Sequence, residues 1–567
     1  MATTAHLDTF ARDRLPPPEQ WPVFRFNADT DYPARMNCVV ELLDRHVREG
    51  RGERIAIRHR NGQTGQIETV TYAQLAALVN RIAHVLVEDM ALVPGNRVLL
   101  RGPNNLMMAA SWLATIKAGL IAVPTMPLLR ARELKQIVDK AQVTAALCDA
   151  RLREDLDANQ RAGGEFHCPT LARALYFNGT GEGSLEAAMA GKPDSFDACD
   201  TASDDTCLIA FTSGTTGQPK GTMHFHRDVL AMCDLFPRHV LRSVPDDIFC
   251  GTPPIAFTFG LGGMLCFPLR IGASTVLAEK LTPESLLELI HDFRATIVFT
   301  APTFYRQMAA LAPRFDISSL RHSVSAGEAL PDATRQSWKA ATGIEMTDGI
   351  GGTEMMHIFI SSAGAEVRPG AIGKVVPGYV AQIVDEEMRP LPPGQVGKLA
   401  VQGPTGCRYL DDPRQANYVK AGWNLPGDTF VADADGYYFY QARSDDMIIS
   451  AGYNIAGPEV ESALMQHEAV AECGVVGAPD DGRGQVVMAY VVLREGVPAD
   501  DVTRTALQDY VKRQIAPYKY PRRIEFVPAL PRTETGKLQR FRLRQMAEQG
   551  SGGSGGNGRS NNGAGKP

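Results

Sequence analysis

Residues 211–221 read Phe211-Thr212-Ser213-Gly214-Thr215-Thr216-Gly217-Gln218-Pro219-Lys220-Gly221 and follow an apolar run that is typical of a buried strand. The glycines let the backbone turn with positive φ and leave room for a large anion. Hydroxyl groups, backbone N–H groups and Lys220 can donate to phosphate oxygens. The stretch is not a Walker A loop, because Gly221 stands where that motif needs Ser or Thr. A phosphate-binding loop is predicted, with an ordinary Gly/Ser/Thr turn as the alternative.

Before this loop, strand-like apolar runs alternate with helical patterns. The alternating segments are Asn96–Leu100, Leu106–Lys117, Ile121–Pro124, Arg130–Ala141 and Ala145–Cys148. Such β-α alternation is typical of an α/β fold with doubly wound, mainly parallel sheets. Thr71 and Gln74 form a capping box that predicts a further helix. Residues 149–203 hold few long apolar runs, and we expect them to be irregular.

The rest of the chain predicts smaller elements. Residues 380–401 alternate between apolar and polar types with Gly/Pro turns, which indicates a small β-barrel-like part or an antiparallel sheet. We expect an N-terminal arm (1–35), a large domain (36–444), a smaller α+β C-terminal domain (445–549) and a disordered Gly/Ser/Asn-rich tail (550–567).

Composition narrows the function classes. The 567 residues are 44% hydrophobic and 22% charged, and the net charge is −6 with no basic block, so nucleic acid is not an expected partner. The ten cysteines show no metal-like spacing and are expected to be reduced thiols of a cytoplasmic protein. No signal peptide is evident. Lys117 and Gly119 interrupt the most apolar stretch, so no membrane span is expected. Oligomeric state is not readable.

Four later stretches contain residues suited to binding or catalysis, and a purely structural role is the alternative for each. They are Met346–Glu354, Gly422–Asp428, Gln441–Ile455 and Pro531–Arg540. Thr353 and Glu354 follow a glycine turn and suit phosphate oxygens and Mg²⁺, although such a pair can also begin a helix. Asp428 can accept hydrogen bonds from a vicinal diol, or belong to a turn. Lys537 lies on a polar, Gly-flanked loop, where most lysines are simply solvated.

Taken in order, these motifs resemble those of the adenylate-forming superfamily, which includes acyl- and aryl-CoA synthetases, peptide-synthetase adenylation domains and firefly luciferase. The resemblance covers about residues 35–548. It implies that a carboxylate attacks ATP to give an acyl-adenylate and pyrophosphate, and that the acyl group then passes to CoA with release of AMP. It also implies that the C-terminal domain is mobile.

The resemblance assigns roles to individual residues. It implies ATP, Mg²⁺ and CoA as reaction partners, Lys537, Glu354 and Thr353 as catalytic residues, and Thr215 and Glu354 as metal ligands. The hinge would be Asp445, and the CoA tunnel would involve Gly452 and Tyr453. The ATP- or AMP-binding residues would be Thr212, Ser213, Gly214, Thr215, Thr216, Gly217, Lys220, Gly327, Glu328, Asp348, Gly349, Thr353, Asp428 and Arg443.

The residues around the expected acyl pocket suggest an aromatic acid. The pocket would be lined by Phe236, Phe257, Phe259, Ala301, Gly327, Ile350 and Gly351. Residues 221–228 and 255–261 most resemble benzoate/2-aminobenzoate–CoA ligases, so 2-aminobenzoate or benzoate is the expected substrate. The alternatives are another aromatic or short aliphatic acid, a carrier-protein acceptor, and a non-catalytic or luciferase-like relative. His224 and His226 could form a metal pair, but structural histidines are favoured.

Overall fold

The computed structural model describes residues 3–60, 65–181, 183–212, 219–443, 446–450, 453–480, 483–515, 517–532 and 538–551. The chain divides into two compact units. The first comprises Met1–Pro426 and Phe430–Tyr440, and the second comprises Gly427–Thr429 and Gln441–Pro567. The division passes through two neighbouring strands, so the chain crosses between the units more than once.

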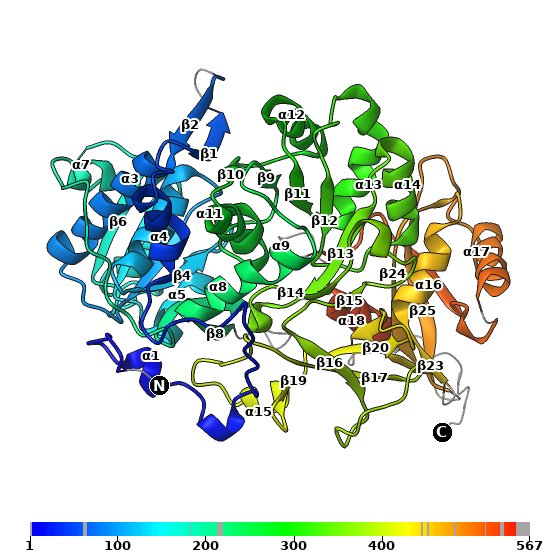
Figure 1. Cartoon of the computed structure of the whole chain (residues 1–567). Helices are drawn as coiled ribbons and strands as arrows, with labels where there is room; N and C mark the ends of the chain where they lie inside the picture. Colours follow the sequence, from blue (N-terminus) through cyan, green and yellow to red (C-terminus); the bar gives the residue numbers. More distant parts are fainter. Residues whose placement is uncertain are drawn as a thin grey trace, which may run out of the picture. The chain divides into compact units, whose positions relative to one another are not determined.

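The first sheet of the large unit carries the strands on either side of the predicted phosphate loop (Figure 1). Its order is β6 (Arg173–Phe177), β5 (Ala145–Asp149), β3 (Arg97–Arg101), β4 (Ile121–Thr125), β7 (Thr206–Thr212), β8 (Lys220–Phe225). All neighbours are parallel except β7 and β8, which are antiparallel. The predicted strand–loop–strand arrangement is therefore a hairpin at one edge of a parallel sheet.

The second sheet has parallel strands in its middle and antiparallel strands at both ends. Its order is β15 (Lys374–Val375), β14 (Ile358–Ser361), β13 (Met346–Gly351), β12 (His322–Ser325), β11 (Ile297–Thr300), β9 (Ile248–Gly251), β10 (Ser274–Val276), β1 (Ile55–Arg60), β2 (Ile67–Thr71). Two mainly parallel sheets in one α/β unit confirm the predicted fold class.

Helices connect the parallel strands. The longer ones in the large unit are α3 (Tyr72–His84), α4 (Leu106–Lys117), α5 (Ala131–Ala141), α6 (Arg153–Gln160), α8 (His226–Asp234), α12 (Pro283–Phe293), α13 (Pro302–Leu311) and α14 (Asp332–Thr342). The shorter ones are α1 (Phe10–Asp13), η1 (Pro18–Gln20), η2 (Val40–Asp44), α2 (Arg45–Arg48), η3 (Val85–Asp89), η4 (Ala150–Leu152), α7 (Leu185–Met189), α9 (Phe236–His239), α10 (Thr258–Leu261), η5 (Gly262–Cys266), α11 (Phe267–Ile271), η6 (Ala312–Arg314), η7 (Thr353–Met355), η8 (Gly364–Glu366) and α15 (Gln415–Tyr418).

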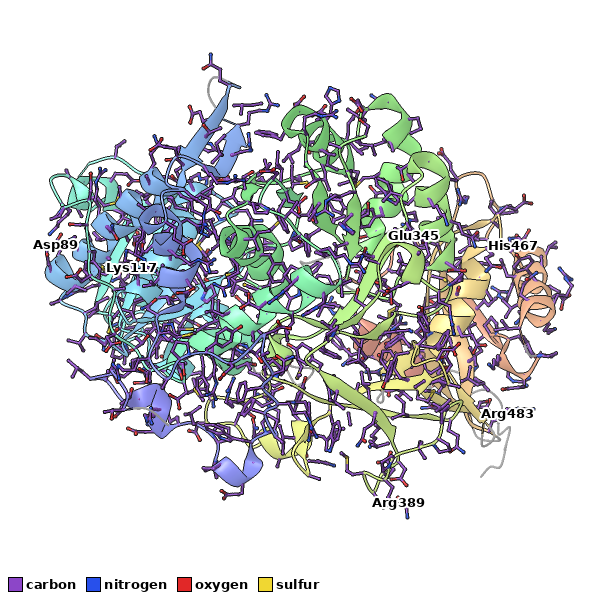
Figure 2. The ribbon with its side chains drawn as sticks, in the orientation of Figure 1. Asp89, Lys117, Glu345, Arg389, His467 and Arg483 are labelled. Atoms are coloured by element: carbon purple, nitrogen blue, oxygen red, sulfur yellow. The ribbon has the colours of Figure 1, made fainter. Side chains whose placement is uncertain are left out.

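Local sequence signals explain several of these helices. The capping box at Thr71 and Gln74 is formed at the start of α3. Helix α4 is buried along almost its whole length. Its one charged residue, Lys117 (Figure 2), donates to Asp44 at 2.8 Å and Asn80 at 2.6 Å. A buried ammonium needs such partners, so Lys117 ties α4 to η2 and α3.

One expectation needs correction: residues 149–203, expected to be irregular, contain α6, β6 and α7. Of the two alternatives for residues 380–401, which belong to a third sheet, the antiparallel sheet is confirmed and the barrel-like part is wrong, since the described residues form no closed barrel. The order of this sheet is β18 (Val419–Lys420), β19 (Trp423–Asn424), β17 (Val396–Gln402), β20 (Asp428–Ala432), β21 (Tyr438–Arg443), with β16 (Val380–Val384) on β17.

The smaller unit has its own sheet and core, as the predicted α+β domain requires. Its strands are β23 (Tyr453–Ile455), β22 (Ile448–Ser450), β25 (Gly484–Leu493) and β24 (Val470–Asp480), with β26 (Arg523–Phe526) parallel to β25. Its helices are α16 (Gly457–Met465), α17 (Asp501–Gln514), η9 (Pro517–Lys519) and α18 (Arg540–Ser551).

Backbone hydrogen bonds tie part of the expected N-terminal arm (1–35) to other segments of the first unit. The backbone N–H of Val23 donates to Gly422, and that of Arg25 donates to Gly403. Within the described residues, none of the helices has the length and apolar character that crossing a membrane requires.

Candidate active site

Some of the residues expected around the nucleotide and the acyl group, among them Ala301, Gly327 and Asp348, lie at one edge of the second sheet. Strands β11, β12 and β13 are parallel, and their register pairs Thr300 with Ser325 and Ser325 with Asp348. The turns that carry Ala301 and Gly327 therefore leave the sheet side by side. Gly327 has a φ of 91°, a conformation that favours glycine. Ligands of open α/β sheets bind at such carboxyl edges.

Asp348 is a buried acid at this edge, only 4% exposed. Burial raises its pKa to about 7, while the Arg335 guanidinium and the Gly349 N–H partly oppose the shift. Asp348 therefore changes charge near neutral pH. It can accept hydrogen bonds when ionised and donate one when protonated.

The structure brings together Lys220 and Glu354, two expected phosphate-end residues that are far apart in the sequence. Lys220 begins β8, and Glu354 lies in η7 directly after Thr353. Between them stands Tyr409, which the sequence analysis missed. The Lys220 ammonium donates to the Tyr409 hydroxyl at 3.2 Å, and that hydroxyl donates to Glu354 Oε1 at 2.6 Å.

Arg408, which precedes Tyr409 in the chain, forms a buried ion pair with Asp228. The Arg408 guanidinium stacks on Phe225, with 3.8 Å to the ring centroid. Burial and the nearby Arg408 lower the pKa of His224 to about 3, so this histidine is neutral. His224 is fully buried and uncharged, which favours the structural role expected for it.

A second cluster surrounds His357, which the sequence analysis also missed. The ring centroid of His357 lies 4.6 Å from Phe267, 5.6 Å from Phe236, 5.7 Å from Phe259 and 6.4 Å from Phe299. Burial lowers the pKa of His357 to about 3, so the ring is neutral. Two expected pocket residues, Phe236 and Phe259, thus pack around an uncharged imidazole.

The hydrogen bonds of His357 define its tautomer. Nε2 lies 3.3 Å from the carbonyl oxygen of Phe259, which can only accept, so Nε2 carries the proton. Nδ1 is then an acceptor, and within the described residues it is buried with no partner. A Cβ at Gly262 would come within 2.5 Å of the His357 ring, so only glycine permits this close approach.

The remaining expected pocket residues are close in sequence to members of the His357 cluster or to Glu354. Phe257 precedes α10 and is half-buried, and Ala301 precedes α13. Ile350 and Gly351 end β13. A cavity of about 580 Å³ lies elsewhere, between the arm and the Tyr409 region, and none of the expected acyl-pocket residues lines it.

His226 lies in a buried group with Cys38 and Cys207, whose possible ligand atoms are within 4.8 Å of one another. Within the described residues, His224 is not part of this group. The backbone N–H of Cys38 donates to His226 Nδ1 at 3.2 Å. That lone pair is therefore already used inside the protein, which favours a structural role.

The described residues include only some of the expected site residues. Ser213, Gly214, Thr215, Thr216, Gly217, Asp445, Gly452 and Lys537 lie outside the described residues, as do the side chains of Arg443 and Tyr453. Thr212 ends β7, and Glu328 follows Gly327 and is half-buried. Asp428 begins β20 and is 6% exposed. It groups with the second unit.

Comparison with known proteins gives consistent matches over most of the chain. A family described as AMP-binding enzyme matches residues 43–408, and the AMP-binding enzyme C-terminal domain matches residues 459–537. The benzoate–CoA ligase of Thauera aromatica is 36% identical over 521 residues, which cover 90% of this chain and 96% of that protein. The 3-hydroxybenzoate–CoA ligase of Aromatoleum sp. (strain CIB) is 32% identical over 91% of this chain and 98% of its own.

Among solved structures, the anthranilate CoA ligase AuaEII in complex with anthranoyl-AMP has a TM-score of 0.86 and 32% identity, covering 93% of this chain and 100% of that one. A benzoate CoA ligase from Burkholderia xenovorans LB400 has a TM-score of 0.79 and 29% identity, covering 90% and 100%.

Proposed function

Since this chain belongs to the family of AMP-binding enzymes and is an AMP-forming acid–CoA ligase, we propose that its acid substrate is 2-aminobenzoate or benzoate. ATP and CoA are the other substrates. The single observation that carries the aromatic substrate is the ring cluster around neutral His357, because two of its members, Phe236 and Phe259, are expected pocket residues. The relatives named above act on benzoate, 3-hydroxybenzoate and anthranilate.

The cluster suits a flat, uncharged ring. Aromatic rings pair favourably in edge-to-face and offset arrangements, so a benzoate ring gains both burial and ring contacts there. The unpartnered acceptor of His357 would pair with an N–H donor on the substrate ring. A 2-amino group supplies such a donor, which favours 2-aminobenzoate over benzoate.

The reaction has two steps. First, the carboxylate oxygen bonds to the α-phosphorus of ATP, and the bond to the β-phosphate oxygen breaks, releasing pyrophosphate. Second, the CoA thiol sulfur bonds to the acyl carbon, and the bond to AMP breaks as the thiol proton is lost. Negative charge builds around the α-phosphorus in the first step, so positioning and electrostatic stabilisation are the main tasks of the protein.

The described residues fit the phosphate end of this reaction. Lys220 supplies a cation and Glu354 a carboxylate oxygen, the ligand type that Mg²⁺ prefers. Glu354 and Thr215 would hold Mg²⁺, which when bound neutralises phosphate charge. Thr212, Ser213, Lys220 and Thr353 would donate to phosphate oxygens.

The two units would have separate tasks. Asp428 would bind the ribose, Arg443 would contact the ribose or a phosphate, and Lys537 would bridge the carboxylate and the α-phosphate in the first step. A rotation about Asp445 would then remove Lys537 and present Gly452 and Tyr453 to CoA.

The test is a panel of aromatic and aliphatic acids with ATP and CoA, read as AMP release. We expect the highest kcat/KM for 2-aminobenzoate, followed by benzoate. Replacing His357 by Phe removes the acceptor but keeps an aromatic ring, and should bring the 2-aminobenzoate/benzoate ratio of kcat/KM close to one. Preference for a long-chain acid would overturn the aromatic substrate, and an unchanged ratio in His357→Phe would overturn the role of Nδ1.

A further inference from the structure

We propose that Tyr409 is a positioning residue for adenylate formation, whose hydroxyl holds Glu354 and Lys220 in the places where they meet the phosphate end of ATP. The hydroxyl accepts from the Lys220 ammonium at 3.2 Å and donates to Glu354 Oε1 at 2.6 Å. This inference rests on the ATP-dependent first step and on the proposed roles of Lys220 and Glu354, but not on the identity of the acid.

Strand pairing places Tyr409 beside Lys220. Tyr409 bridges Thr222 in antiparallel register, and backbone bonds flank the bridge: Met223 donates to Arg408 and Leu410 donates to Gly221, both at 2.8 Å. Paired residues point to the same face of a sheet, and so do residues two apart on one strand. Tyr409 therefore shares a face with Thr222 and with Lys220.

The same segment also anchors the turn that carries Glu354. Thr405 donates from its hydroxyl to the carbonyl oxygen of Met355 at 2.8 Å. Tyr409 donates to the neighbouring residue, Glu354. Residues 405–409 thus join β8, which carries Lys220, to η7, which carries Thr353 and Glu354.

Neighbouring residues hold Tyr409 in place. Its backbone N–H donates to Gln415 Oε1 at 2.9 Å, and the residue is 1% exposed. The ring packs edge-on against Tyr418, with 5.9 Å between centroids. Because the residue is buried, packed and hydrogen-bonded through its backbone and its hydroxyl, little further conformational entropy is lost when the hydroxyl holds its two partners.

The direction of the hydrogen bonds suits this task. An ionised carboxylate can only accept hydrogen bonds and a phenol hydroxyl carries a proton, so the Tyr409 hydroxyl is the donor to Glu354. The contact uses one carboxylate oxygen, Oε1. A carboxylate and an ammonium that are already oriented need little reorganisation when charge develops on the phosphates.

The test replaces Tyr409 by Phe, which removes only the hydroxyl. We expect kcat/KM for ATP in acid-dependent ATP–pyrophosphate exchange to fall roughly 10- to 100-fold, the range for losing a hydrogen bond to a charged group. The Mg²⁺ concentration for half-maximal exchange should rise. Thioester formation from supplied acyl-adenylate and CoA should stay within about 2-fold of wild type, because that step does not use the β- and γ-phosphates.

A double-mutant cycle identifies the route of the effect. In a Glu354→Gln background, Tyr409→Phe should cost less than about 3-fold in single-turnover adenylation, because residues that act through one contact are not additive. Tyr437→Phe is the matched control: its hydroxyl donates to the Glu366 carbonyl oxygen at 2.9 Å, away from the site. It should leave both half-reactions unchanged.

Three results would overturn the positioning role: equal loss in both half-reactions, full additivity with Glu354→Gln, or normal exchange at all Mg²⁺ concentrations. All assays use whichever acid the wild-type enzyme accepts best. Rejection of aromatic acids by the wild type would therefore refute the proposed substrate and leave the Tyr409 test intact.

Discussion

Replacing Asp348 by Asn should stabilise the protein relative to wild type, and this gain should be larger at alkaline pH than at acid pH. Burial raises the pKa of Asp348 from 3.8 to about 7. Between these values the native state keeps a proton that the unfolded chain has released. Wild-type stability therefore falls as the pH rises through this interval, and Asn, which carries no charge, is spared the loss.

The expected magnitude follows from the shift. A shift of about three pKa units corresponds to roughly 4 kcal/mol at full development, at 1.36 kcal/mol per unit. Wild type has lost about 2 kcal/mol of unfolding free energy at pH 5 and about 4 kcal/mol at pH 8.5. The stability advantage of Asn should therefore grow by roughly 2–3 kcal/mol between these two pH values. For the first unit, with roughly 440 residues, the unfolding entropy makes this about 3 °C in Tm.

The assay is thermal unfolding of wild type and Asp348→Asn at pH 5 and pH 8.5, at one scan rate. Asp246→Asn is the control, because it makes the same substitution at a side chain that is 89% exposed. An Asn advantage that is the same at both pH values would refute the buried-charge reasoning. Repeating the scans with ATP tests the expected nucleotide contact: a donor that bonds the ionised carboxylate lowers its pKa and should shrink the pH dependence.

Two further predictions separate the half-reactions and use ATP–pyrophosphate exchange beside thioester formation from supplied acyl-adenylate. Lys537→Ala should lower exchange by at least about 100-fold, the loss of a preorganised charge donor, and spare thioester formation; equal loss in both assays would show that another lysine is responsible. Asp445→Pro should spare exchange and lower thioester formation, because proline restricts φ at the proposed pivot; normal turnover in both assays would contradict the hinge.

Local patterns predicted most of the fold because they are properties of short segments. The capping box at Thr71 and the apolar helix Leu106–Lys117 are both formed as expected. Strand β6 (Arg173–Phe177) was missed because it is an edge strand with mostly part-exposed residues, and it is held by parallel pairing with β5. Its signal lies in the partner strand and not in its own sequence.

The site residues also divide into those that the sequence predicts and those that it does not. Lys220, Thr353 and Glu354 stand out in the sequence because phosphate and Mg²⁺ demand particular residue types at particular spacings. Tyr409 and His357 have no such requirement: the first lies in a plain strand-like segment, and the second follows Glu354 by a few residues without a motif of its own. Their significance comes only from contacts with residues distant in the chain.

This difference has a physical basis. A residue that touches the ligand must match the chemistry of the ligand, which is the same in every protein that binds it. A residue that positions such a group needs only the right donor or acceptor at the right point, and the segment that supplies it depends on the packing of the whole unit. The hydroxyl of Tyr409 meets Glu354 because the register of residues 408–410 on β8 brings it there. A shift of one residue in that register would turn the side chain to the opposite face. The hydrogen bond that supports Glu354 therefore depends on the register of this strand pair, which the sequence of residues 408–410 alone does not reveal.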